Sequence, residues 1–386
     1  MEKYKVLFEI IGKCMFGGNI SQVTESLMSD GFLLGVFAEA KKHDIANEFS
    51  YCLDKLGMIS KGTPLADVCS EEQFLSVYRF ENQSYEFGRI CSVFEENKIP
   101  FMILKGAVIR NYYPENWLRT SCDIDILVKS DEVDKAKDIL VDKLAYRFEK
   151  KTPHDYQLFS SNGVHLELHY TLIDDDILVE ANKVLENVWE NKEKLDGYEF
   201  GYKMNPDVFY YFHIAHMAKH ILTGGCGLKP FLDLCFIEKN IKNTDKPWSM
   251  LKEGKIDKVN TVINHLKDVW FFGKEHNEKT RRLERYVISG GVYGNVENLV
   301  SVKKEGKGDT FKYALRRIFI PYNKLIYRYP QLENKKVLLP YYEVKRWFDL
   351  LLGGRGKRAF DEFKINSTML EEQVDEVQQM KRDLGI

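Results

Sequence analysis

The stretch Leu104–Ser130 reads LKGAVIRNYYPENWLRTSCDIDILVKS and places two acidic residues inside an apolar run. Asp123 and Asp125 alternate with Ile124 and Ile126, which is the period-two pattern of a β-strand. Residues two apart on a strand point to the same face, so the two carboxylates project together. Two like charges held this close repel each other unless a cation lies between them. The pattern therefore predicts a hard divalent cation with oxygen ligands, above all Mg²⁺.

A third acid strengthens this interpretation, because a D-x-D pattern alone is common on solvated strand edges. The segment YQLFSSNGVHLELHY, residues 156–170, reads as two strands joined by an Asn-Gly turn. On its second strand His165, Glu167 and His169 share one face. If that strand lies beside the first, Glu167 reaches the same cation, and three carboxylates can hold two metal ions.

A lysine and a glycine precede the acids. Lys105 and Gly106 close a short apolar strand and open a helical turn, where backbone N–H groups can bind phosphate. Lys105 and Arg119 add cationic side chains. The alternatives are an ordinary strand-ending turn, a solvated lysine and a structural arginine–carboxylate pair, and the local pattern leaves them open.

The hydrophobic period changes along the chain and divides it into four regions. We expect a helical region over 1–95, an α/β core over 96–173, a helical substrate-cleft region over 174–300, and a basic then acidic helical region over 301–386. Ser70 is the expected N-cap of the last helix before the core. The predicted fold class is α+β, with a small mixed β-sheet flanked by N-terminal and larger C-terminal helical regions.

The segment 206–224 carries three histidines on one predicted helix face, namely His213, His216 and His220. Three histidines on a face can bind zinc. Histidines in a helix beside an active site are more often structural or hydrogen-bonded to substrate, so we favour that reading. We therefore place His216 and His220, together with Asp233, in a substrate cleft.

Composition narrows the classes of protein that fit. The chain has 56 basic and 58 acidic residues, so no global field draws it to nucleic acid or membrane. Its seven cysteines form no C-x-x-C pair, which argues against a disulfide framework or a zinc site. Neither a signal-peptide core nor a membrane span is expected. These features predict a soluble cytoplasmic protein; the oligomeric state does not follow from them.

Residues 301–360 differ from the rest of the chain. They contain 15 basic and 5 acidic side chains, interleaved with tyrosines such as Tyr313 and Tyr341. Such a segment can bind RNA, because cations follow phosphates and aromatic rings stack on bases. A solvated basic face with tyrosines packed into a helical layer is the favoured alternative, since the whole chain is near neutral.

The order LKG…R…DIDILV, a helix and VHLELHY resembles the catalytic core of the nucleotidyltransferase superfamily of DNA polymerase β. The longer pattern is similar to a branch of uncharacterised bacterial nucleotidyltransferases with an LKG…YP…R…DIDLLV signature. That branch also has an HxxKH-like helix, an LxxxxDL element and a late YP…LLP segment. Here these features correspond to HMAKHI at 216–221, LKPFLDL at 228–234 and YPQLENKKVLLP at 329–340. The resemblance covers about 70–350.

The resemblance implies Mg²⁺-dependent transfer of a nucleoside monophosphate from an NTP such as ATP to a hydroxyl or phosphate acceptor, with release of pyrophosphate. Mn²⁺ is an alternative cofactor, and a small-molecule acceptor is favoured over RNA or protein. The resemblance assigns catalysis and metal binding to Asp123, Asp125 and Glu167. It assigns nucleotide binding to Lys105, Gly106 and Arg119.

One departure from the superfamily affects this assignment. Ala107 follows Gly106, where the superfamily usually has serine or glycine. A hydroxyl contact to phosphate is then missing from the turn, and nucleotide binding must come from the backbone and basic side chains. Two further hypotheses stay open: a non-catalytic nucleotide-binding protein of the same fold, and an RNA-modifying, toxin-like nucleotidyltransferase.

Overall fold

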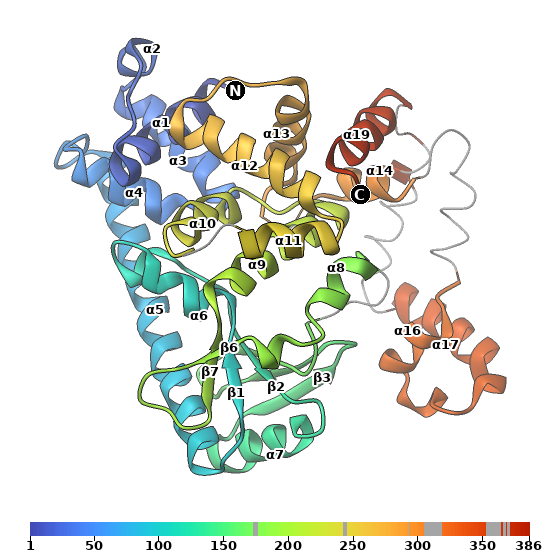
Figure 1. Cartoon of the computed structure of the whole chain (residues 1–386). Helices are drawn as coiled ribbons and strands as arrows, with labels where there is room; N and C mark the ends of the chain where they lie inside the picture. Colours follow the sequence, from blue (N-terminus) through green and yellow to red (C-terminus); the bar gives the residue numbers. More distant parts are fainter. Residues whose placement is uncertain are drawn as a thin grey trace.

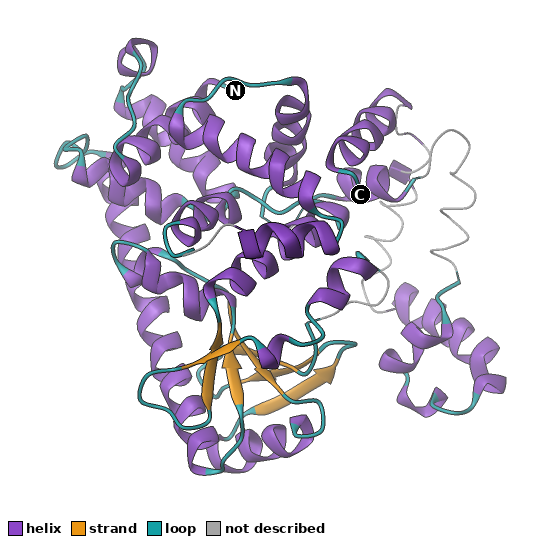
Figure 2. Ribbon diagram, viewed as in Figure 1, coloured by secondary structure: helices purple, strands orange, loops and turns teal. Residues whose placement is uncertain are grey.

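The computed structural model describes residues 1–172, 177–241, 245–292, 294–304, 319–352, 364–365, 368 and 371–386. Over this part of the chain the protein has the predicted α+β fold, a mixed sheet flanked by helices (Figures 1 and 2). None of the helices in the described residues is both long and apolar enough to cross a bilayer.

Helices make up the chain before the sheet: α1 (Glu2–Phe16), α2 (Gln22–Ser26), α3 (Asp30–Lys42), α4 (Ala46–Lys55) and α5 (Pro64–Glu96). The long helix α5 begins earlier than the sequence pattern suggested. Thr63 is its N-cap and accepts a hydrogen bond from the Ala66 N–H at 3.3 Å, while Pro64 takes the first helical position. The predicted cap at Ser70 is therefore wrong, because the Thr-Pro pair starts the helix before it.

The described residues form one seven-stranded sheet, ordered β3-β4-β5-β2-β1-β7-β6. Its strands are β1 (Phe101–Ile103), β2 (Asp123–Val128), β3 (Arg147–Lys151), β4 (Asp155–Phe159), β5 (His165–His169), β6 (Lys192–Lys194) and β7 (Gly201–Met204). The pairs β1–β2, β3–β4, β4–β5 and β6–β7 are antiparallel, and β2–β5 and β1–β7 are parallel. Strands β1, β2, β4 and β5 were expected; β3, β6 and β7 were not.

The two faces of the sheet have different roles. Ile124 of β2 lies with Phe80 and Phe87 of α5, and α5 in turn packs on α7 (Val133–Leu144). Figure 1 shows α7 beneath this face of the sheet. Because side chains alternate along β2, the opposite face carries Asp123 and Asp125. The apolar half of the alternation thus fixes the strand against α5 and leaves the acids facing the other way.

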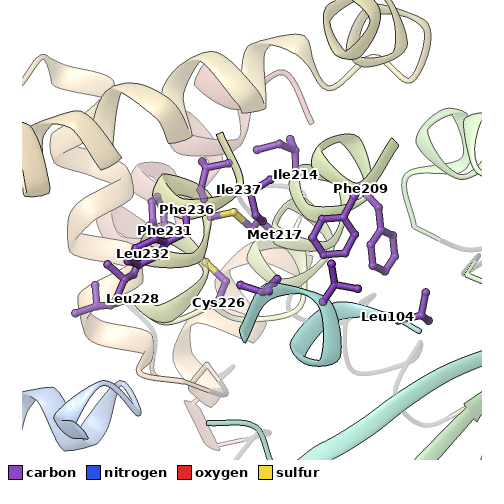
Figure 3. Packing of buried hydrophobic residues seen from close by; sticks show 14 of the residues in the cluster. Leu104, Phe209, Ile214, Met217, Cys226, Leu228, Phe231, Leu232, Phe236 and Ile237 are labelled. Atoms are coloured by element: carbon purple, nitrogen blue, oxygen red, sulfur yellow. The ribbon is translucent and has the colours of Figure 1, made fainter. Parts of the chain in front are cut away.

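A helical layer lies across the acidic face. It contains α6 (Lys105–Ile109), α8 (Val179–Val184), α9 (Pro206–Leu222), α10 (Lys229–Glu238), α11 (Asp245–Glu253), α12 (Asp257–Phe272), α13 (Glu278–Gly290), α14 (Val296–Lys303) and α19 (Glu371–Leu384). Helices α1 and α19 both pack on α12, so the first and last described helices share this layer. Figure 3 shows side chains of α9 and α10, among them Met217 and Phe231, meeting in the core that holds α9 in place.

The described part of the basic, tyrosine-rich segment forms a small helical unit of its own. It contains α16 (Tyr322–Arg328) and α17 (Leu339–Leu352), which Figure 1 shows at the edge of the molecule. Leu325, Tyr329 and Leu332 form its core, and Tyr342 packs against them. Several predicted features, including Tyr313 and the boundary at 173/174, lie outside the described residues.

Candidate functional site

Two adjacent strands carry the three acids predicted from the sequence. The parallel register between β2 and β5 sets Asp125 opposite Glu167 and Asp123 opposite His165. Ligand atoms of Asp123, His165 and Glu167 all lie within 4.8 Å of one another. The same holds for Asp125, Glu167 and His169, so the two sets share Glu167. The structure therefore brings the acids close enough for shared metal ions, far inside the roughly 10 Å beyond which oxygen ligands could not bridge them.

Lys105 is the cation in direct contact with these acids. The chain leaves β1 at Ile103 and turns sharply, with Lys105 at a φ of 37°. This turn brings the Lys105 ammonium to 2.7 Å from Oδ1 of Asp125. Burial alone would lower the pKa of Lys105, but the charges of the surrounding carboxylates, Asp125 first, raise it above its ordinary value. Lys105 therefore stays charged and serves as a built-in counter-cation.

His169 is a member of the cluster that the sequence analysis did not assign. Its Nε2 lies 2.9 Å from Oδ1 of Asp125 and 3.4 Å from the Glu167 carboxylate. Burial would lower its pKa, but hydrogen bonds to these two acids raise it instead. The signal in the sequence was its position, because His169 shares a strand face with Glu167 two residues earlier.

The carboxylates of this cluster outnumber its lysine, and the charge imbalance is concentrated on Asp123. Burial, followed by the negative charge of Asp125, raises the pKa of Asp123 to about 7. Burial would raise the pKa of Asp125 too, yet Lys105 and His169 hold it below its ordinary value. Asp125 is thus neutralised by its neighbours, whereas within the described residues no cation contacts the Asp123 carboxylate directly, and Asp123 favours the approach of another cation.

The donor set fits a hard divalent ion. Three carboxylates supply oxygen ligands, which Mg²⁺ and Mn²⁺ prefer. A ring nitrogen of His165 also lies within 4.8 Å of the ligand atoms of Asp123 and Glu167, so His165 can add a nitrogen ligand to the oxygens.

Arg119 lies at the edge of this cluster but is engaged elsewhere. Its Nε and Nη2 donate to the two carboxylate oxygens of Asp233 at 3.1 and 2.9 Å. The Tyr113 hydroxyl donates to the same carboxylate at 2.7 Å. Asp233 is 1% exposed and lies behind Arg119, so it is not on the wall of the cavity that adjoins the acids. For Arg119 the geometry matches the arginine–carboxylate alternative as well as a nucleotide contact.

The acids open into a cavity of about 400 Å³. Lys105, Gly106 and Arg119 line one end of it, so the structure gathers the three residues assigned to nucleotide binding. The far side contains the apolar side chains of Leu172, Ile177, Leu178, Leu185, Phe212 and Ala215. The cavity is therefore charged at the sheet and largely apolar opposite it.

Two of the three histidines of α9 face this cavity. The Nε2 atoms of His216 and His220 lie 3.1 Å apart, and both residues line the wall. Burial lowers the pKa of each, to about 4 for His220, so the pair is neutral at pH 7. His213 instead lies 2.8 Å from the carbonyl oxygen of Pro230 and does not join them. The described residues thus give His216 and His220 a cleft position and His213 a packing contact.

Comparison with known proteins decides the family. A family model described as "uncharacterised nucleotidyltransferase" matches residues 35–271, more than half of the chain. The chain belongs to this nucleotidyltransferase family. The matched range includes both acid-bearing strands, the turn at Gly106 and the α9 histidines, so the cavity lies within the family's shared region. Among curated proteins, none matches the nucleotidyltransferase chain.

Proposed function

We propose that this nucleotidyltransferase transfers a nucleoside monophosphate from an NTP to a hydroxyl or phosphate group of a small molecule, in a reaction that depends on Mg²⁺. The observation that carries the proposal is the cluster of Asp123, Asp125 and Glu167 on two adjacent strands, with more negative charge than its neighbours neutralise. Nucleotidyl transfer requires such a centre, because charge accumulates on the phosphate oxygens as the reaction proceeds.

Asp123, Asp125 and Glu167 would hold Mg²⁺, with Mn²⁺ as an alternative. When bound, the metal supplies neutralisation of phosphate charge and activation of the acceptor oxygen. Glu167 faces the cavity and can also accept the acceptor's proton. Lys105 and Gly106 lie where the cavity meets the strand-to-helix turn, and they are the proposed contacts for the phosphates, with Arg119 beside them.

The shape of the cavity favours a small acceptor. Its volume of about 400 Å³ is within the range of small-ligand sites, and Phe212 and Leu185 present apolar surface opposite the acids. A groove for RNA would instead be open and lined by cations. In the described part of the basic segment, Tyr322, Tyr329 and Tyr342 pack with one another, which leaves fewer rings for stacking on bases.

The test is turnover. The protein is incubated with each NTP, Mg²⁺ or Mn²⁺ and a panel of small hydroxyl and phosphate compounds, and pyrophosphate release is measured. We expect metal-dependent release with at least one acceptor and none from an Asp123→Asn, Asp125→Asn double variant. Tight binding of the magnesium NTP without release for any acceptor would support the non-catalytic alternative. Release that requires RNA and weakens steeply as salt rises would support the toxin-like alternative.

A further inference from the structure

Two polar side chains from the segment before β2 surround the turn at Gly106. A Cβ built on Gly106 would lie 3.3 Å from Oγ of Ser121 and 3.4 Å from Nη1 of Arg119. Gly106, Arg119 and Ser121 also line the main cavity together. Ser121 comes from the segment just before β2, and its hydroxyl lies next to the turn. The hydroxyl that Ala107 cannot supply is thus present on another residue.

Ser121 is held in a defined position. Its hydroxyl lies 3.0 Å from Oε1 of Gln83 on α5 and 3.0 Å from the Asp123 carbonyl oxygen. The Gln83 amide in turn donates to the Ser121 carbonyl oxygen at 2.8 Å. Gln83 therefore connects the long helix α5 to Ser121, two residues before Asp123.

Arg110 contacts the same turn. Its Nε donates to the Gly106 carbonyl oxygen at 3.0 Å, and its Nη2 lies 3.2 Å from Oε1 of Gln83 and 3.5 Å from Oγ of Ser121. The guanidinium also lies over the ring of Phe80, 5.6 Å from its centre. In the described residues these partners are all neutral, so Arg110, unlike Arg119, has no carboxylate to balance its charge.

This imbalance gives Arg110 affinity for an anion. Burial and the charge of Arg119 lower the pKa of Arg110 to about 10, which still leaves it positive at pH 7. A largely desolvated cation without a counter-charge is unfavourable until an anion arrives. Arg110 lines a second, smaller cavity of about 180 Å³ together with Asp123, which also lines the main one. Arg110 is not itself on the wall of the main cavity, but Ser121, whose Oγ lies 3.5 Å from its Nη2, is. The uncompensated cation is therefore next to the acid cluster.

We propose that Arg110 and Ser121 complete the phosphate site at Gly106 and bind the two terminal phosphates of the NTP, the group that leaves as pyrophosphate. This inference rests on the proposed function and adds residues to it. In the transfer the acceptor oxygen bonds to the α-phosphorus and the bond from that phosphorus to the bridging oxygen breaks. The electron pair stays on pyrophosphate, and the acceptor's proton passes to Glu167 and from there to solvent. Arg110 and Ser121 stabilise the charge on the leaving group.

The experiment measures binding of inorganic pyrophosphate with Mg²⁺ by titration calorimetry, which needs no knowledge of the acceptor. For Arg110→Gln we expect a loss of affinity of roughly tenfold or more, since a charged hydrogen bond to phosphate is removed. Ser121→Ala should lose about threefold to tenfold, as a neutral hydrogen bond contributes less. Arg147→Gln, at an exposed arginine of β3 that pairs with Glu149, is the matched control and should bind as the wild type does.

The outcomes separate this inference from the proposed function. Arg110→Gln that binds pyrophosphate within twofold of the wild type overturns the role of Arg110 and leaves the transferase proposal intact. A wild-type protein that binds neither magnesium pyrophosphate nor any magnesium NTP overturns both. If Arg110→Gln does not fold, Arg110→Lys replaces it: a point charge without the two-pronged geometry should bind several-fold more weakly than arginine. Unchanged affinity in that variant would again overturn the inference.

Discussion

Two buried cation–carboxylate pairs lie within the same structure, yet they differ in charge balance. Arg119 and Asp233 form a two-pronged pair, with one cation for one carboxylate and Tyr113 adding a hydrogen bond. At Lys105 one ammonium faces several carboxylates, and Asp123 has its pKa raised as a result. A balanced buried pair serves the fold, whereas a cluster with surplus negative charge costs stability and indicates a site that awaits a cation.

The largest expected effect concerns the surplus charge itself. Asp123→Asn should reduce pyrophosphate-releasing turnover by about a thousandfold or more, because it removes a metal ligand that stabilises charge in the transition state. Its melting temperature without Mg²⁺ should hold or rise, since repulsion with Asp125 is relieved. Both quantities are measured on the same preparation, with and without Mg²⁺.

Asp125→Asn sharpens this test. It should lose turnover equally but also melt lower, because Asp125 accepts from Lys105 and His169. The metal proposal for this strand fails if Asp123→Asn melts several degrees lower while keeping near-normal turnover per folded molecule.

Substitution in the balanced Arg119–Asp233 pair should lower stability, whereas Asp123→Asn should not. Asp233→Asn leaves the Arg119 guanidinium buried without its counter-charge, so the free energy of unfolding should fall by about 3–5 kcal/mol. Urea unfolding measures the change. Glu149→Gln on β3 breaks an exposed arginine pair and should change it by less than about 1 kcal/mol. Equal effects of the two substitutions would mean that the buried Arg119–Asp233 pair contributes no more to stability than an exposed pair does.

Lys105→Gln tests whether the lysine substitutes for metal. Without Mg²⁺ the acids lose their counter-cation, so the variant should melt a few degrees lower than the wild type. Added Mg²⁺ should then raise its melting temperature by more than it raises that of the wild type. A smaller Mg²⁺-induced rise in the variant would show that Lys105 supports metal binding rather than replacing it.

A smaller effect, on the pH dependence of the melting temperature, is expected at Glu48, which lies within range of the Asp233 charge. Glu48 is fully buried, and neither of its carboxylate oxygens has a hydrogen-bond partner within the described residues. Burial raises its pKa from 4.5 to about 8, so the folded protein holds a proton there that the unfolded chain has released. Stability linked to Glu48 is therefore present below about pH 4.5 and is lost as pH rises to about 8.

Glu48→Gln removes this titration. Relative to the wild type, its melting temperature should increase by about 4 °C between pH 5 and pH 8. Thermal melts across that range give the difference. A difference that does not change with pH would mean that Glu48 is ionised in the folded protein, with the Lys229 charge compensating it.

How much the sequence predicted depends on how local each signal is. The acids, the hairpin and their shared face follow from strand alternation around Asp123 and Glu167, and the structure places them together. Strands β6 and β7 did not follow, because each is short and β7 is stabilised by pairing with β1, about 100 residues earlier in the chain. The partner of Arg119, 114 residues away, is equally invisible to local patterns.

The sequence analysis missed the proposed phosphate contacts for the same reason. Ser121 and Arg110 meet only because Gln83 of α5 holds both, and nothing in their spacing indicates that contact. His169 could have been assigned, since it shares a face with Glu167. Its bond to Asp125, however, depends on the parallel register of β2 and β5, which are separated in sequence by α7, β3 and β4.

The two edge strands of the sheet influence how the protein can self-associate. The outer strand on one side, β3, has the sequence RFEKK and is exposed along its length, and the outer strand on the other side, β6, has the sequence KEK. Lysines on outer strands oppose the addition of a strand from a neighbouring chain. Concentrated solutions should therefore resist growth of intermolecular sheets. Any self-association is expected to use helical surfaces instead.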